Sequence, residues 1–313
     1  MPAPIAICPV LAGPTAAGKT SLIVALAKRH PIEVISLDSR QIHKGLRIGT
    51  AQPTEEEQAL CRHHLIDFVP PTESYSAARF RADFISAWTD IRARHHIPIL
   101  VGGAGLYLSA VEKGLFEMPG LDPATTAQVR EQLSGLPTEE LRARLRASDP
   151  ASWTRIHPSD RYRTQRALEI CLATGRTMTE QMQAHDRSPD PALGLAFPLV
   201  WVTRDRAELH ARIAARTRAM LAAGWMEETA ALLAKHGPHA RGLRAIGYRE
   251  LVARLQGELG EEELAPRITA ATRQYAKRQE TWFRPLPKAA EGRPDAPALT
   301  AALESLLTAA AAT

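Results

Sequence analysis

The sequence has few cysteines and no long hydrophobic run. Its three cysteines, Cys8, Cys61 and Cys171, lie far apart and form no CxxC pair, which excludes a disulfide framework and a cysteine-based zinc site. No apolar run approaches the ~18–20 residues that a membrane span needs. The first residues also lack the cationic and apolar segments of a secretory signal. We therefore expect a cytoplasmic protein with no membrane partner.

The composition that remains is that of an ordinary globular protein. Of 313 residues, 45% are hydrophobic and 23% are charged, which is enough chain for one large domain or two modest ones. The net charge of +5 permits a polyanionic partner but does not require one.

Apolar runs alternate with helical patterns in much of the chain. Strands are expected at 5–12, 32–37, 97–101 and 198–203. Strands that alternate with helices predict a parallel α/β sheet with helices on both faces. The stretch 120–196 has no strand pattern, and its helical segments (near 123–134, 138–147, 160–174 and 177–185) predict an all-helical insertion.

These patterns divide the chain into four parts. Residues 1–119 form the first part of an α/β core and 120–196 the helical insertion. Residues 197–288 return to the core as a mostly helical part, with helices at 206–235, 246–256 and 261–282. The Ala- and Pro-rich tail 289–313 is expected to be frayed, with at most a short helix near 298–308.

A phosphate-binding loop is the clearest motif. Eight residues between an expected strand and an expected helix fit the pattern GxxxxGK[ST]: Gly13, Pro14, Thr15, Ala16, Ala17, Gly18, Lys19 and Thr20. The glycines let backbone N–H groups curl around phosphate oxygens at the start of a helix. Lys19 adds a full charge and the Thr20 hydroxyl can ligate Mg²⁺. The motif predicts a P-loop phosphate or diphosphate site without deciding whether phosphoryl transfer follows.

Three classes of function are compatible with that loop. The protein could be a P-loop small-molecule kinase or hydrolase, an enzyme that holds a diphosphate leaving group, or an RNA-binding ATPase. A carboxylate that follows an apolar strand can bind the metal of a P-loop enzyme, and both Asp38 and Asp67 stand in such places. These residues do not separate the three classes.

Further motifs resemble one family along residues 5–285. They are Gly13–Thr20, Asp38–Pro53, His63–Asp67, Tyr75–Phe80, Gly102–Tyr107, Arg166–Glu169, Ala245–Glu250 and Thr272–Arg284. In this order they resemble the tRNA dimethylallyltransferases. That family transfers a dimethylallyl group from its diphosphate to N6 of the adenosine at tRNA position 37, beside the anticodon. The partners implied are tRNA, through its anticodon stem-loop, and dimethylallyl diphosphate, with Mg²⁺ as cofactor; we also expect a monomer.

The resemblance assigns the chemistry to few residues. It places the general base at Asp38, because an exocyclic adenine amine needs a carboxylate to take its proton. The alternative for Asp38 is an indirect role at Mg²⁺ or a helix N-cap. Residues 13–20 hold the diphosphate, with Mg²⁺ on Thr20. Arg212 and Arg216, four residues apart on an expected helix, either clamp the diphosphate or lie on a solvated face.

The resemblance also implies the tRNA-binding residues. They are Asp38, Ser39, Arg40, Gln41, Ala104, Tyr162, Arg163, Thr164, Gln165, Arg166, Arg244, Ala245, Ile246, Gly247, Tyr248 and Arg249. Two positions depart from the family: Ala104 replaces the threonine of GGTGLY, and His43 replaces a tyrosine. Basic clusters at 155–166 and 273–284 suit RNA phosphates, although each alone fits a plain solvated face.

Overall fold

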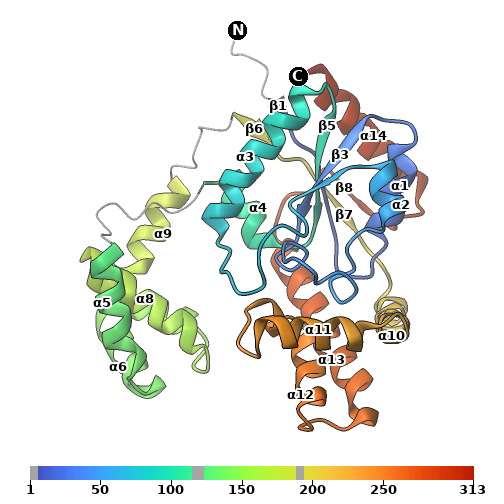
Figure 1. The fold of residues 1–313 in the computed structure, drawn as a ribbon. Helices are drawn as coiled ribbons and strands as arrows, with labels where there is room; N and C mark the ends of the chain where they lie inside the picture. The colour runs from blue at the N-terminus through green and yellow to red at the C-terminus, as the bar shows by residue number, and fades with distance from the viewer. Residues whose placement is uncertain (1–5, 115–122, 188–193) are drawn as a thin grey trace. The chain divides into compact units, whose positions relative to one another are not determined.

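The computed structural model describes residues 6–114, 123–187 and 194–313 (Figure 1). The chain forms two compact units, one of Met1–Glu112 with Leu193–Thr313 and one of Lys113–Ala192. The second unit begins and ends a few residues before the insertion expected at 120–196. No helix among the described residues is both long and apolar enough to cross a membrane.

The first unit is built on a six-stranded sheet in the order β4-β3-β5-β2-β7-β8, and every pair in it is parallel. The parallel α/β core expected from the sequence is therefore confirmed. A separate pair is formed by β1 and β6. The strands are β1 Ala6–Ile7, β2 Val10–Ala12, β3 Ile32–Leu37, β4 His63–His64, β5 Ile97–Gly102, β6 Leu195–Ala196, β7 Leu199–Val202 and β8 Ala290–Gly292.

The single strand expected at 5–12 is instead two strands that join different sheets. Pro9 lies between them, and a proline has no N–H to donate to a sheet. Its carbonyl still accepts a hydrogen bond from Leu100 N, at 2.9 Å, and β2 continues into the phosphate loop.

Helices cover both faces of the sheet (Figure 1). On one face α1 and α14 pack around Leu22, Ile23 and Leu303. On the other face α3 and α4 pack around Phe80 and Leu108. These helices are α1 Lys19–Ala27, α2 Glu55–Leu60, α3 Ala77–Ala93, α4 Gly105–Glu112 and α14 Pro297–Ala312.

The tail is not frayed, contrary to expectation. Ala290–Gly292 pairs with Val200–Val202 as an additional strand of the sheet. Leu299, Leu303 and Leu307 are four residues apart on α14, so they form one stripe, and all three are buried in the core. The alanines in this segment favour a helix, and the leucine stripe fixes it on the sheet.

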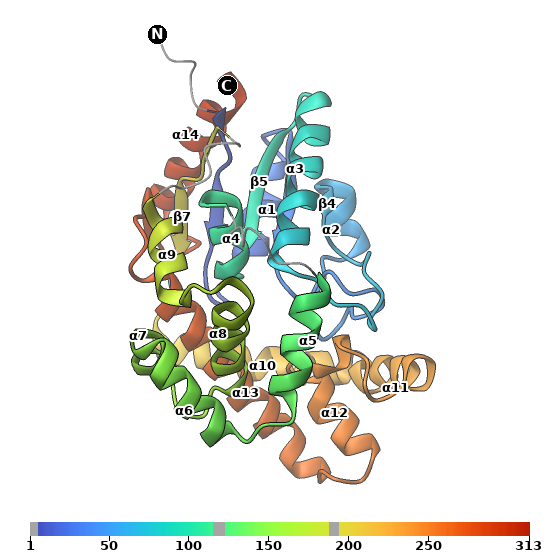
Figure 2. The ribbon, with the colours of Figure 1, turned by 90° about the vertical axis from the view of Figure 1, so that its left-hand side faces the viewer.

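Four further helices lie beyond one end of the sheet (Figures 1 and 2). The helix expected at 206–235 is broken at Gly224, whose φ of +95° suits glycine and ends a helical run. Trp225, Tyr248 and Leu251 are buried in a core of their own. The helices are α10 Arg206–Ala222, α11 Trp225–His236, α12 Tyr248–Leu255 and α13 Glu261–Phe283, with a 3-10 turn, η2, at Gly242–Arg244.

The second unit is helical throughout its described residues. Leu133, Leu141, Leu145 and Leu168 are buried in its core. Within the described residues of this unit, α7 is the helix missed from the sequence, and Asp149 begins it by accepting a hydrogen bond from Ser152 N. The helices are α5 Pro123–Ser134, α6 Thr138–Ser148, α7 Pro150–Arg155, α8 Arg161–Thr174 and α9 Met178–Arg187.

Candidate active site

The phosphate loop joins β2 to α1, as expected. Glycine is required at its two glycine positions for different reasons. A Cβ atom on Gly13 would lie 2.9 Å from the Val202 carbonyl oxygen, so only glycine lets the loop pass so close to β7. Gly18 has φ +105°, a conformation that other residues rarely adopt, and it precedes the first residue of α1.

Cationic side chains bind the carbonyl oxygens of this loop. Lys19 Nζ donates to Gly13 O at 2.8 Å and to Pro14 O at 3.0 Å. Arg212 Nε donates to Ala16 O at 2.9 Å, and Arg204 Nε donates to Ala17 O at 2.6 Å. With these carbonyls bonded, the loop can present its N–H groups to an anion at the positive end of α1.

Two cations crowd the loop. Burial, and then the neighbouring Arg216, lower the pKa of Lys19 to about 8. Burial also lowers the pKa of Arg216, with a further contribution from Arg212, while Asp38 opposes the change. Positive charge so desolvated is stabilised by an anion, which makes a diphosphate group a suitable ligand here.

Asp38 follows the last residue of β3 at the same edge of the sheet. Its Oδ1 accepts hydrogen bonds from Arg40 N at 2.7 Å and Gln41 N at 3.2 Å, which fixes the turn after the strand. Among the described residues no donor bonds to Oδ2. Asp38 therefore caps a turn with one oxygen, and no helix begins there as one alternative expected, while its other oxygen stays available.

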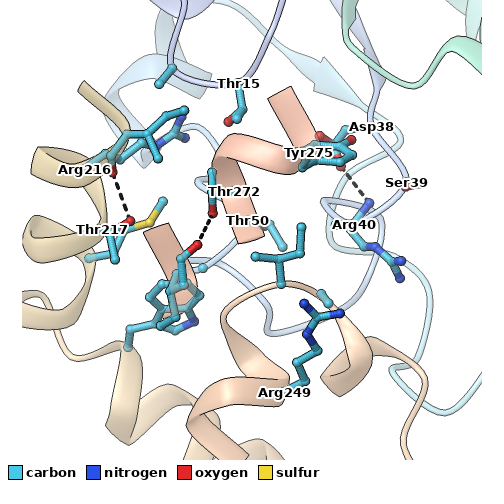
Figure 3. Close-up of a pocket in the computed structure, with 18 of the residues that line it drawn as sticks. Thr15, Asp38, Ser39, Arg40, Thr50, Arg216, Thr217, Arg249, Thr272 and Tyr275 are labelled. Carbon is cyan, nitrogen blue, oxygen red and sulfur yellow. Dashed lines mark hydrogen bonds between the residues drawn. The ribbon is translucent and has the colours of Figure 1, made fainter. Parts of the chain in front are cut away.

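A pocket of about 300 Å³ is lined by Asp38, Arg216 and the loop residues Thr15 and Ala16 (Figure 3). Asp38 is the single acid among its described lining residues. Apolar side chains, those of Ile213, Met220 and Trp225, line it as well. The arginines that line the pocket are Arg40, Arg216, Arg244, Arg249 and Arg278. A site with one carboxylate, five arginines and apolar side chains suits an anionic ligand with a hydrocarbon part.

The structure collects many of the expected site residues in this pocket. Those that line it are Thr15, Ala16, Asp38, Ser39, Arg40, Arg216, Arg244, Ala245, Ile246 and Arg249. Those of the same unit that do not are Gly13, Pro14, Ala17, Gly18, Lys19, Thr20, Gln41, Ala104, Gly247 and Tyr248. Arg212 also lies outside the lining, where it holds the outer side of the loop.

Two of the expected RNA-binding side chains are bonded inside the protein. Tyr248 is fully buried, and its hydroxyl donates to Glu228 Oε1 and accepts from Gly49 N. Gln41 accepts from Ser36 Oγ and donates to Ala51 O, which ties the turn after β3 to residues 50 and 51. Both side chains stabilise the walls of the site.

The expected RNA-binding stretch 162–166 begins α8 in the helical unit. Tyr162 is 79% exposed, and Arg163 is exposed with an ion pair to Asp160 at 3.0 Å. Thr164 and Arg166 are held in place, since Thr164 Oγ1 donates to Asp160 O and Arg166 pairs with Glu169. Gln165 Nε2 donates to Glu169 Oε1 at 3.3 Å.

The two residues that depart from the family pattern, Ala104 and His43, lie in different surroundings. Ala104 is half-buried in the turn before α4, and its N–H donates to Leu37 O at 3.0 Å. His43 is buried away from the pocket, and burial lowers its pKa. Asp67 accepts from Gly45 N and pairs with Arg47, so it stabilises a loop and does not enter the pocket.

Sequence reasoning did not assign the apolar lining, or Tyr275 on α13, to the pocket. Trp225 is 2% exposed and packs against Gly49 and Gly247, where a Cβ atom would lie about 2 Å from its ring. These two glycines belong to motifs already noticed, so an unexplained pair of glycines was the available signal. Tyr275 lies beside Asp38 in the pocket (Figure 3), and its signal was its place in the motif 272–284 and in the basic cluster 273–284.

The residues present are compatible with Mg²⁺ bound mainly through a ligand. Mg²⁺ keeps several waters and takes one or two protein oxygens together with substrate phosphates. The exposed Thr20 hydroxyl, on the first turn of α1, has no protein partner among the described residues. No group of three or more histidine, cysteine, aspartate or glutamate side chains in the described parts is placed to hold a metal alone.

Comparison with known proteins identifies the family of the chain. A family model described as IPP transferase matches residues 41–285. The tRNA dimethylallyltransferase of Chromobacterium violaceum is 44% identical over 281 residues, 88% of this chain and 86% of that protein. The tRNA dimethylallyltransferase of Anaeromyxobacter dehalogenans is 47% identical over 279 residues, 88% of this chain and 91% of that protein.

Solved structures give the same result. The tRNA isopentenylpyrophosphate transferase of Bacillus halodurans superposes with a TM-score of 0.68 at 33% identity, over 96% of this chain and 94% of that chain. A eukaryotic dimethylallyltransferase acting on tRNA gives a TM-score of 0.75 at 28% identity, over 89% of this chain and 70% of that chain. The chain therefore belongs to the IPP transferase family, as its motifs predicted.

Proposed function

We propose that the protein is a tRNA dimethylallyltransferase, an enzyme that transfers the dimethylallyl group of dimethylallyl diphosphate to N6 of adenosine 37 in tRNA and releases diphosphate. The observation that carries this proposal is the juxtaposition of Asp38 and the phosphate loop in one pocket that also has apolar lining residues. A phosphate loop alone would suit a kinase equally well, and family membership separates the two.

The acceptor amine reacts at Asp38. The lone pair of N6 is delocalised into the adenine ring, so the amine is a poor nucleophile. Oδ2 of Asp38, which has no hydrogen-bond donor among the described residues, orients the amine and takes its proton as the N–C bond forms. Oδ1 stays bonded to Arg40 N and Gln41 N, which holds the carboxylate in one orientation.

The leaving diphosphate departs into the phosphate loop. As the bond from the allylic carbon to oxygen breaks, the electron pair and negative charge stay on the diphosphate. Lys19, Arg216 and the loop N–H groups stabilise that charge. Thr20 would hold Mg²⁺ together with the diphosphate, and the ion would supply further charge stabilisation there.

The tRNA reaches the pocket with its adenosine unstacked. A base within a stacked anticodon loop cannot enter a pocket, so the nucleotide must be extruded. Exposed arginines at the pocket, Arg40, Arg244 and Arg249, suit contacts to the RNA phosphates. We include Tyr162 and Arg163 of the helical unit as RNA contacts, on the basis of the family resemblance and their exposure.

The proposal also covers assembly and compartment. We propose a monomer, since one chain carries both the phosphate loop and Asp38 of the pocket. We propose a cytoplasmic enzyme, because three separated cysteines without a disulfide fit a reducing compartment and the substrate is tRNA.

Two parallel incubations test the function. In one, the protein receives radiolabelled dimethylallyl diphosphate and unmodified tRNA; in the other, it receives labelled ATP and candidate small-molecule acceptors. We expect label in tRNA in the first and no acceptor phosphorylation in the second. The opposite pattern would identify a kinase and overturn the proposal.

A further inference from the structure

The phosphate loop has a hydrogen-bonding partner far along the chain. Gln279 lies near the C-terminal end of α13 and is 6% exposed. Its Oε1 accepts a hydrogen bond from Thr15 N at 2.9 Å, and its Nε2 donates to Gly103 O at 3.2 Å. One side-chain amide thus bonds to the loop that follows β2 and to the loop that follows β5.

The second of these loops leads to Asp38. The N–H groups of Gly103 and Ala104 both donate to Leu37 O, at 3.0 Å each, and Leu37 is the last residue of β3. Asp38 is the next residue. Gln279 is therefore connected, through the Gly103 peptide and Leu37, to the backbone that carries the proposed base.

The place of Gln279 is tightly defined. A Cβ atom on Gly103 would lie 2.1 Å from Gln279 Nε2, so the amide occupies space that only a glycine leaves open. A buried amide needs both an acceptor and a donor for its two ends, and here each end has one. Because Thr15 N is bonded to Gln279, this N–H is not among those that remain for a phosphate.

We propose that Gln279 is a positioning residue, which fixes the separation between the phosphate loop and Asp38 and hence between the leaving diphosphate and the proton acceptor. This inference rests on the proposed function. Gln279 acts through Thr15 and Gly103 and need not touch either substrate. It is absent from the residues that the family resemblance assigned to the site.

Replacing the amide by a thioether of similar length tests this role. Gln279→Met fills the same space but can neither accept from Thr15 N nor donate to Gly103 O. A misplacement of about 1 Å costs on the order of 10²-fold in rate, so we expect the single-turnover rate to fall roughly 10- to 100-fold. The KM for tRNA should stay within about two-fold, because RNA binding is spread over many phosphate contacts.

A second variant gives a signature that loss of packing would not give. In Gln279→Glu, a neutral carboxylic acid can accept from Thr15 N and donate its O–H to Gly103 O, whereas a carboxylate can only accept. The rate of this variant, divided by the wild-type rate at each pH, should therefore rise as the pH falls. Taking the ratio removes the pH dependence that the two enzymes share. Burial raises the pKa of Tyr275, one turn away and hydrogen-bonded to Gln279, so it stays neutral throughout.

Gln274 provides the matched control, because it is a glutamine on the same helix but is exposed. Gln274→Met should retain the wild-type rate. If wild type and Gln274→Met transfer no dimethylallyl group, the proposed function fails and this inference fails with it. If both are active and Gln279→Met is equally fast, the inference alone is overturned. Should Gln279→Met not fold, a rate ratio for Gln279→Glu that is constant with pH would overturn it.

Discussion

The two ends of β3 carry carboxylates in opposite circumstances. Glu33, near the start of the strand, is 3% exposed and accepts from Arg94 through both oxygens and from His64 Nε2 at 2.6 Å. His96 Nδ1 lies 2.9 Å from its other oxygen. Asp38, after the end of the strand, has one oxygen bonded to a turn and one that accepts from no donor in the part of the chain that the structure describes.

The difference indicates what each carboxylate does. Burial disfavours the charge of Glu33, but hydrogen bonds from Arg94 and His64 outweigh it, so the pKa of Glu33 is lowered overall. Both oxygens of that carboxylate are hydrogen-bonded within the fold. At the other end the fold leaves an oxygen, a loop of N–H groups and several arginines without anions, which is a binding site. The strand thus has a carboxylate that stabilises the fold at one end and a carboxylate available for catalysis at the other.

The largest effect is expected at the catalytic end. Asp38→Asn keeps the acceptor for the turn but cannot take a proton, so the single-turnover rate should fall by about 10²–10⁴. Affinity for tRNA, measured by filter binding, should change little because arginines and lysines contact the phosphates. A normal rate together with lost RNA binding would make Asp38 a binding residue.

Arg163→Ala should have the reverse effect of Asp38→Asn, because it should weaken tRNA binding and leave the rate nearly intact. Its guanidinium is exposed and pairs only with Asp160 among the described residues, so its removal should not disturb the fold. We expect weaker tRNA binding with a salt dependence shallower by about one phosphate contact, and a nearly intact rate at saturation.

Substitution of Glu33, at the other end of β3, should lower the stability of the protein rather than its rate. Glu33→Gln removes the buried counter-charge of His64 and leaves Arg94 paired with Asp90, so the free energy of unfolding should fall, by less than the about 3–5 kcal/mol of a fully buried pair. Urea denaturation measures this. Glu304→Gln, which removes the partly exposed pair with Arg29, should cost less than about 1 kcal/mol. Equal losses in the two variants would contradict the distinction.

The same comparison predicts a pH dependence. Because the pKa of Glu33 is lowered in the folded state, its contribution is complete above the ordinary value near 4.5 and is lost as the pH falls through the folded value. The stability gap between wild type and Glu33→Gln should therefore narrow as the pH falls below about 4.5. A gap that widens in acid would refute this account of the cluster.

A smaller effect is expected in the phosphate loop. Lys19→Ala removes a charge that the backbone cradle cannot replace, and a hydrogen bond to a charged group is worth about 1.5–3 kcal/mol. Affinity for dimethylallyl diphosphate, by calorimetry, should fall about 10- to 100-fold. Lys28→Ala, exposed at the other end of α1, should have no effect. Unchanged affinity in Lys19→Ala would remove this loop from the site.

The smallest effect concerns the departure at Ala104. Ala104→Thr restores the hydroxyl typical of the family and should leave diphosphate affinity unchanged and the transfer rate equal or a few-fold higher. Ala104→Val has the same shape without the hydroxyl and separates the hydrogen bond from crowding. A large loss in both would mean that the wall of the site has packed around alanine.

The sequence predicted what depends on neighbours along the chain. The motif of residues 13–20 and the apolar run before Asp38 were sufficient to place a loop and a carboxylate at one edge of a parallel sheet. It did not predict contacts between distant segments, such as the bond of Gln279 to Thr15, 264 residues apart. Such contacts arise from tertiary packing, which the local periodicity of hydrophobic residues does not indicate.

The tail shows the same limit in the fold itself. A short segment, Ala290–Gly292, has no apolar pattern of a strand, and it becomes one because β7 offers an unpaired edge. Likewise Gly224 divides α10 from α11 through a backbone conformation that composition alone does not reveal. Patterns in sequence indicate what a segment favours, and the neighbouring elements decide the outcome.

One measurement tests the central claim most directly. After reaction with dimethylallyl diphosphate, the tRNA is digested to nucleosides and analysed by mass spectrometry, and released diphosphate is measured in the same sample. The account predicts dimethylallyl on N6 of adenosine 37, with one diphosphate released for each modified adenosine, and almost none of either with Asp38→Asn. Diphosphate release without modified adenosine, or a prenyl group on another atom, would contradict it.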